Sequence, residues 1–194
     1  LYKNQPQKHP ICGKTCTHDG IHPDLVWEGI KELVDAKAGN YYLMNSVTRT
    51  DQSTWYCDNN VNLCLNGHSI TAAHDSYAIM VRNGANFTLT DCKENSGTIT
   101  HGSGKTGSGV MVNSGGSFTM YGGTICGNTA ADSGSGVIVN NGSRFTMYGG
   151  AITGNNTTGE VSCGGVYVAS NGTFTVSGAA KIQGNWRNGT LQDG

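Results

Sequence analysis

The sequence predicts an all-β fold: a right-handed parallel β-helix (β-solenoid) of about five coils with an N-terminal capping segment. Three observations lead to this prediction. A unit of about 30 residues recurs along most of the chain. Apolar and polar residues alternate within its short segments. Asn or Gly recurs at one place in each unit, where a tight corner needs a positive φ.

Each unit contains two short strands whose apolar residues fall at alternate positions, so that they point to one side. Strands this short cannot bury a face alone. Stacking successive units about 4.8 Å apart gives continuous parallel sheets and internal ladders of like side chains. We therefore expect two such ladders, one of Val81, Val112, Val139 and Val168, the other of Phe87, Phe118, Phe145 and Phe174.

A third strand follows in each unit and is centred on an isoleucine, and an asparagine recurs shortly after it. Because stacked Asn side chains satisfy one another and the corner backbone, this column favours a solenoid over a sandwich. The isoleucines are Ile99, Ile125, Ile152 and Ile182, and the asparagines are Asn128, Asn155 and Asn185.

The start of the chain departs from the repeat. We expect residues 1–39 to form a Cys/His knuckle and a capping helix, and residues 40–194 to form the parallel β-helix. The helix is predicted at 24–34, where apolar residues have helical spacing behind the capping residue Asp24. Residues 40–44 and 61–70 are interpreted as one irregular first coil, with a longer loop around 54–56.

Composition narrows the classes of partner. The 194 residues include 30 glycines, only 13% are charged, and the net charge is −1. Without a basic or acidic block, electrostatics favour neither nucleic acid nor an anionic membrane, and no apolar run approaches the roughly 18 residues of a membrane span. Seven cysteines in a lysine-poor chain are compatible with an oxidising exterior, so we expect a secreted or cell-surface protein, present as a monomeric module of a longer chain.

Two thiols and three imidazoles lie within residues 9–22. This donor set suits a tetrahedral structural zinc ion, and the ligands we choose are His9, Cys12, Cys16 and His22, with His18 as the alternative to His9. A Cys12–Cys16 disulfide beside solvated histidines is the second option, and two free thiols are the third. Four protein ligands would leave no open position for water, so the metal would be structural.

Cys64 and Cys92 both follow the apolar run of successive units. They are therefore candidates for a disulfide between coils, which requires Cα atoms within about 7 Å. Two buried thiols are the alternative. Cys126 shares its column with Thr153 and Gln183 and is expected to face outward.

Several segments resemble the right-handed parallel β-helix (pectin-lyase-like) modules of bacterial cell-surface and secreted proteins, notably those of gut anaerobes. The segments are VNLCLNGHSIT at 61–71, LTDCK at 89–93, and the units FTMYGGTI at 118–125 and FTMYGGAI at 145–152. The resemblance covers roughly residues 40–190. It implies a fold rather than an activity, since the family holds lyases, hydrolases, adhesins and many modules without assigned activity.

The carboxylates do not favour catalysis. Sugar-cleaving enzymes of this fold need carboxylates close together, either as acid and base or around Ca²⁺. Here the repeat units carry only dispersed acidic residues, and His68 and His101 are expected to be solvated turn histidines. No catalytic residue is therefore assigned. The acidic residues are Asp75, Asp91, Glu94, Asp132 and Glu160.

An outward polar and aromatic stripe is the remaining candidate site. Thr88, Thr119, Thr146 and Thr175 share one column, with Tyr121 and Tyr148 beside it, and Thr119, Tyr121, Thr146 and Tyr148 are the expected ligand-binding residues. Ordinary β-propensity on a solvated sheet is the alternative. We expect a non-catalytic extracellular structural or binding module of a bacterial surface protein, adhesin-like or glycan-binding, whose partner is a glycan or host surface. A degenerate or partial polysaccharide-active enzyme, a lyase or glycoside hydrolase, is the alternative.

Overall fold

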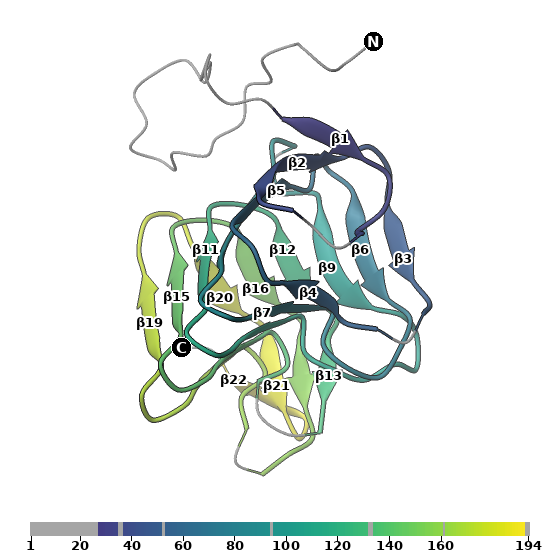
Figure 1. Ribbon diagram of the computed structural model, residues 1–194. Coiled ribbons are helices and arrows are strands. Elements are labelled where there is room, and N and C mark those ends of the chain that lie inside the picture. Colours follow the sequence, from purple (N-terminus) through teal and green to yellow (C-terminus); the bar gives the residue numbers. More distant parts are fainter. Residues whose placement is uncertain are drawn as a thin grey trace.

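The computed structural model describes residues 27–34, 37–51, 53–93, 95–131, 134–160 and 162–192. These residues are all-β and contain no helix. Their short strands stack in parallel as a β-solenoid of about five turns (Figure 1). The fold class expected from the repeat is therefore confirmed.

Three long sheets run the length of the solenoid and a small fourth sheet lies beside them. Sheet A contains β1 (Glu28–Ile30), β2 (Gly39–Leu43), β5 (Val61–Cys64), β8 (Asn86–Thr90), β11 (Ser117–Met120), β15 (Arg144–Met147) and β19 (Thr173–Val176). Sheet B contains β3 (Val47–Arg49), β6 (Ser69–Ala72), β9 (Thr98–His101), β12 (Thr124–Cys126), β16 (Ala151–Thr153) and β20 (Lys181–Gln183).

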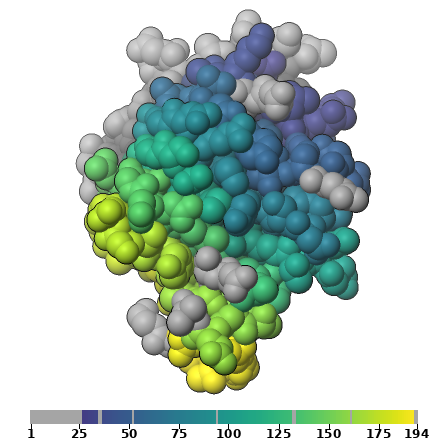
Figure 2. Space-filling view, turned by 60° about the horizontal axis from the view of Figure 1, so that its bottom comes forward, coloured from purple at the N-terminus to yellow at the C-terminus, as the bar shows by residue number. Residues whose placement is uncertain are grey.

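Sheet C contains β4 (Trp55–Cys57), β7 (Ile79–Val81), β10 (Val110–Val112), β14 (Val137–Val139) and β18 (Val166–Val168). Sheet D contains β13 (Thr129–Ala130), β17 (Asn156–Thr157), β21 (Asn185–Arg187) and β22 (Thr190–Gln192). The chain visits sheets A, B and C in turn, so each coil lies on the one before it. The surface colours accordingly run in chain order from one end of the molecule to the other (Figure 2).

The registers confirm the expected internal ladders. Val112 pairs with Val81 and Val139, and Val139 pairs with Val168. The phenylalanines pair in the same way across β8, β11, β15 and β19. Their rings stack with centroid separations of 5.4, 4.7 and 4.9 Å, and Trp55 meets the first ring, Phe87, edge-on at 5.7 Å. One aromatic stack therefore runs through the core.

The asparagine ladder forms as expected and has a direction. Asn128 Nδ2 donates to Asn155 Oδ1 at 2.9 Å, and Asn155 Nδ2 donates to Asn185 Oδ1 at 3.0 Å. Each of these amides also donates to main-chain carbonyls, as Asn155 does to those of Ile125 and Thr153. The ladder thus satisfies buried corner backbone that water cannot reach.

Two expectations for the N-terminal part are wrong. In the described part of the predicted helix, Glu28–Ile30 form strand β1 in register with Tyr41–Leu43. The backbone N–H and C=O groups of this segment pair with a neighbouring strand of sheet A and not with each other, as they would in a helix. Residues 40–44 and 61–70 do not form one coil, because Tyr41 pairs in parallel with Leu63, which places β2 and β5 in successive coils. Trp55–Cys57, expected in a loop, form β4 of sheet C.

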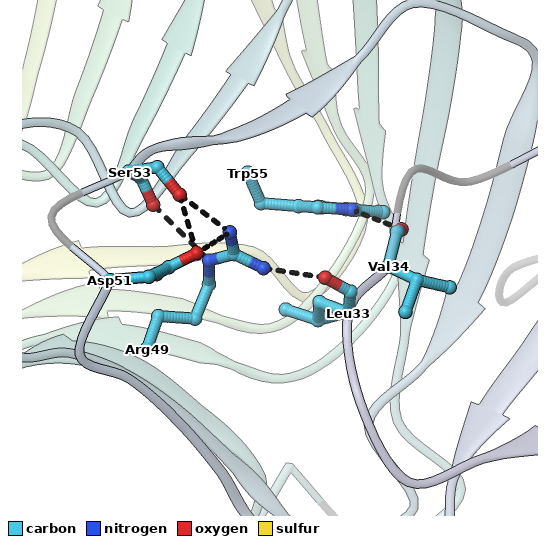
Figure 3. Close-up of polar contacts among 6 residues, drawn as sticks. All are labelled: Leu33, Val34, Arg49, Asp51, Ser53 and Trp55. Carbon is cyan, nitrogen blue, oxygen red and sulfur yellow. Dashed lines mark hydrogen bonds and ion pairs between the residues drawn. The ribbon is translucent and has the colours of Figure 1, made fainter.

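Residues 31–34 cross the end of the solenoid in place of the predicted helix. Leu33 is buried in the core, and its carbonyl accepts a hydrogen bond from the Arg49 guanidinium (Figure 3). The Trp55 Nε1–H donates to the Val34 carbonyl at 3.0 Å. Arg49 is itself held by Asp51 and by Ser53, whose hydroxyl accepts from Nη2 at 2.9 Å. The cap is therefore an extended segment fixed by side chains of the first coil.

At the other end, β22 folds back antiparallel on β21, unlike every other strand pair described. The inward residues Phe174 and Ile182 of the last coil are only partly buried, and Val176 is exposed. Among the described residues no further coil packs on them.

Candidate functional site

The outer face of sheet A carries the predicted threonine column. Thr119 lies between Thr88 and Thr146 in register, and Thr146 pairs with Thr175. Towards the N-terminal end the same column continues with Asn62 and Asn40, whose amide groups are joined by a hydrogen bond of 2.7 Å. The sheet therefore presents one continuous row of hydroxyl and amide groups.

A second outward column lies beside this row, two residues further along each strand. Tyr121 and Tyr148 stack within it, with centroids 5.1 Å apart and planes at 10°. Main-chain bonds place Tyr121 next to the end of β8 and Ser177 next to the end of β15. The structure thus brings together all four predicted binding residues, Thr119, Tyr121, Thr146 and Tyr148.

The stacking limits how these rings can meet a ligand. Because Tyr121 and Tyr148 face each other, neither ring offers its shared face to solvent. The next residue in the column is Ser177, whose short side chain cannot cover a tyrosine ring. Tyr148 is 40% exposed and Ser177 is exposed. The open aromatic surface therefore lies at Tyr148, above Ser177 and beside Thr146 and Thr175.

Two described carboxylates of the repeat, Asp91 and Asp75, are engaged in separate sets of hydrogen bonds. Asp91 is buried and accepts main-chain N–H groups from Gly67, Gly97 and Lys93 at 2.7–3.1 Å. Asp75 accepts from the N–H of Thr106 at 2.8 Å, and this bond lowers the pKa of its carboxyl. Each carboxylate thus fastens a loop of its own. Glu94 and Asp132 lie outside the described residues.

The histidines correct a sequence prediction. His101, expected to be solvated, is buried: its Nδ1 lies 2.7 Å from Asn128 Oδ1 and its Nε2 lies 2.7 Å from the Ser76 carbonyl. His74 is also buried, with its ring 6.4 Å from that of His101, and neither of its ring nitrogens has a partner in the described part of the chain. Burial lowers the pKa of His74, and the proximity of His101 lowers it further.

Cys64 and Cys92 lie in contact as thiols. Their predicted disulfide stays a prediction. The predicted zinc ligands His9, Cys12, Cys16 and His22 lie outside the described residues. Within the described ranges, no group of three or more His, Cys, Asp or Glu side chains is arranged to hold a metal ion.

The sequence pattern did not indicate a cavity of about 290 Å³ at the N-terminal end of the solenoid. Its apolar wall includes Ile30, Tyr41 and Leu63, and Glu28 and Lys37 are among its charged lining residues. These residues come from separate strands and from the cap, so no local motif signals the cavity.

No helix in the described residues is long and apolar enough to cross a membrane. No protein-family model, curated protein or solved structure matches the chain. The strand topology alone gives the class of protein, a parallel β-solenoid.

Proposed function

We propose that this chain is a non-catalytic structural and binding module of a secreted or cell-surface bacterial protein, adhesin-like in role, and that sheet A binds a glycan. The pectin-lyase-like resemblance of the FTMYGG units supports a bacterial surface origin. The proposal rests mainly on one observation, the 40% exposure of Tyr148, which stacks on Tyr121 and lies beside a row of hydroxyl groups.

This arrangement suits a sugar ring. The apolar face of a pyranose stacks on an aromatic ring, while its hydroxyl groups bond to polar side chains at the edge of the stack. Thr146 and Thr175 lie in register beside Tyr148. Ser177, the next residue of the tyrosine column, has a short side chain and leaves room for a sugar ring. The repeat of the column along the solenoid axis would allow further sugar units to follow the threonine row.

The positions and hydrogen bonds of Asp91 and Asp75 support binding without catalysis. Acid–base cleavage of a glycosidic bond uses two carboxyl groups that flank the bond. Asp91 is fixed by main-chain N–H groups inside the coil, and Asp75 holds the loop at Thr106. Asp91 is buried, and Asp75 lies between β6 of sheet B and β7 of sheet C, so neither is available beside the tyrosines of sheet A.

A glycan array probed with the chain and with Tyr148→Ala tests the proposal. We expect at least one class of glycan to bind, with affinity falling about tenfold or more in the variant because the stacking surface is lost. Tyr56→Ala is the matched control, since Tyr56 is 38% exposed but lies on β4 of sheet C. Equal losses in both variants, or none in Tyr148→Ala, would refute the assigned face.

The same preparations are incubated with pectic and host polysaccharides. Turnover above a buffer blank would replace this proposal with the alternative, a polysaccharide-active enzyme.

A further inference from the structure

Cys64 and Cys92 form an isolated sulfur pair on the outside of sheet A. Cys64 lies at the end of β5 and is fully buried, and Cys92 lies just beyond the end of β8 in the next coil. Leu65 N–H donates to the Thr90 carbonyl at 2.9 Å, which holds these two strand ends together. Trp27 and Tyr42 pack on Cys64, and Cys92 packs against the same small cluster.

The two sulfurs differ in access and in proton affinity. Cys92 is partly exposed, and its thiol donates to Asn66 Oδ1 at 3.3 Å. The hydrogen bond with Cys92 and burial together raise the pKa of the Cys64 thiol well above its usual range. An external reagent therefore meets Cys92 first, and Cys64 lies behind it.

We infer that Cys64 and Cys92 are a site of reversible disulfide formation that joins two successive coils, with Cys92 as the attacking thiol and Cys64 as the resolving thiol. The oxidant is a low-molecular-weight disulfide such as glutathione disulfide. Cys92 thiolate attacks one of its sulfurs, the reagent's S–S bond breaks, and one small thiolate leaves. Cys64 then gives its proton to that thiolate and attacks the Cys92 sulfur; the mixed S–S bond breaks, and the second small thiolate leaves and takes up the proton that Cys92 had released to solvent.

Other described cysteines provide an internal comparison. Cys57 is fully buried inside the core, away from an external reagent, and its thiol donates to the Asn59 carbonyl at 3.2 Å instead of contacting a partly exposed cysteine. Cys126 is partly exposed on sheet B, in register with Thr153 and without a cysteine opposite it. Within the described residues, Cys64 and Cys92 are thus distinguished by mutual contact and not by exposure alone.

Peptide mapping of the whole chain tests the inference. The protein is equilibrated in buffers of graded glutathione to glutathione disulfide ratio, acid-quenched, alkylated and digested with trypsin. The residues 50–82 and 83–93 are separate tryptic peptides, the first with Cys57 and Cys64 and the second with Cys92. We expect these two peptides to become linked through Cys64 as the disulfide fraction rises, and to separate on reduction with dithiothreitol.

Two variants accompany the mapping. Cys92→Ser abolishes the link, while Cys126→Ser, a comparably exposed cysteine, leaves it intact. The oxidised protein should melt about 5 to 10 °C above the reduced protein, and Cys92→Ser should lose this difference. Absence of the link at every ratio, linkage through Cys57, or glutathione retained on Cys92 would each overturn the inference.

Discussion

Replacing Phe145 by Ala should cost about 3 to 5 kcal/mol of stability. Phe145 is fully buried, and its ring stacks between Phe118 at 4.7 Å and Phe174 at 4.9 Å. The change removes a large side chain and two ring contacts, each worth about 0.5 to 1.5 kcal/mol beyond burial. Coils on both sides hold the backbone in register, so the structure cannot collapse into the cavity.

Chemical denaturation followed by circular dichroism measures this cost, with Phe174→Ala and Thr146→Ala as controls. Phe174 lies in the last described coil and is only partly buried, so its loss should cost less. Thr146 points outward from the same strand as Phe145 and should cost under about 1 kcal/mol. Because a solenoid can unfold from one end, midpoints are compared together with slopes. Equal losses for Phe145→Ala and Thr146→Ala would refute the assignment of faces.

Asn155→Ala should cost about 2 to 5 kcal/mol in the same assay, because it removes the acceptor of the buried Asn128 N–H and the donor to two main-chain carbonyls, whereas exposed Asn141→Ala should be near neutral. The lowered pKa of His74 means that the unfolded chain binds its proton more tightly, so stability should fall as pH drops below the unfolded value of about 6.5. His74→Gln should flatten that part of the pH profile, and an unchanged profile would contradict it. Elemental analysis of chelator-free protein should find about one zinc per chain if residues 9–22 bind metal, whereas blocked thiols without metal would indicate the disulfide.

The repeat was predictable because each coil buries the same types of side chain at the same positions. A Val, Phe or Ile that recurs at one offset has to stack on its equivalents, so the ladders follow from spacing alone. The N-terminal coils were predicted wrongly because their spacing is irregular. Leu63 and Trp55 occupy ladder positions, but irregular connections hide their offset. Residues 27–34 have helical spacing, yet Glu28–Ile30 among them pair with β2 as a strand.

The candidate site was only half predictable. Alternation placed Thr146 and Tyr148 on the outside, and the structure confirms that they lie together. Spacing could not show that Tyr148 stacks on Tyr121, which leaves at most one face of each ring for a ligand. That depends on the side chain in the following coil, where Ser177 is small.

The burial of His101 follows from the direction of the asparagine ladder. The two side-chain links of the ladder run from Nδ2 of one asparagine to Oδ1 of the asparagine in the next coil, so the Oδ1 of the first one, Asn128, is left to accept from another donor. In the repeat, His101 stands where later coils have Gly127 and Gly154, so it is the one side chain at this corner able to reach Asn128. Its other nitrogen faces the Ser76 carbonyl, which is also an acceptor. These two contacts fix the His101 ring 6.4 Å from that of His74, and burial first, then this proximity, lowers the pKa of His74.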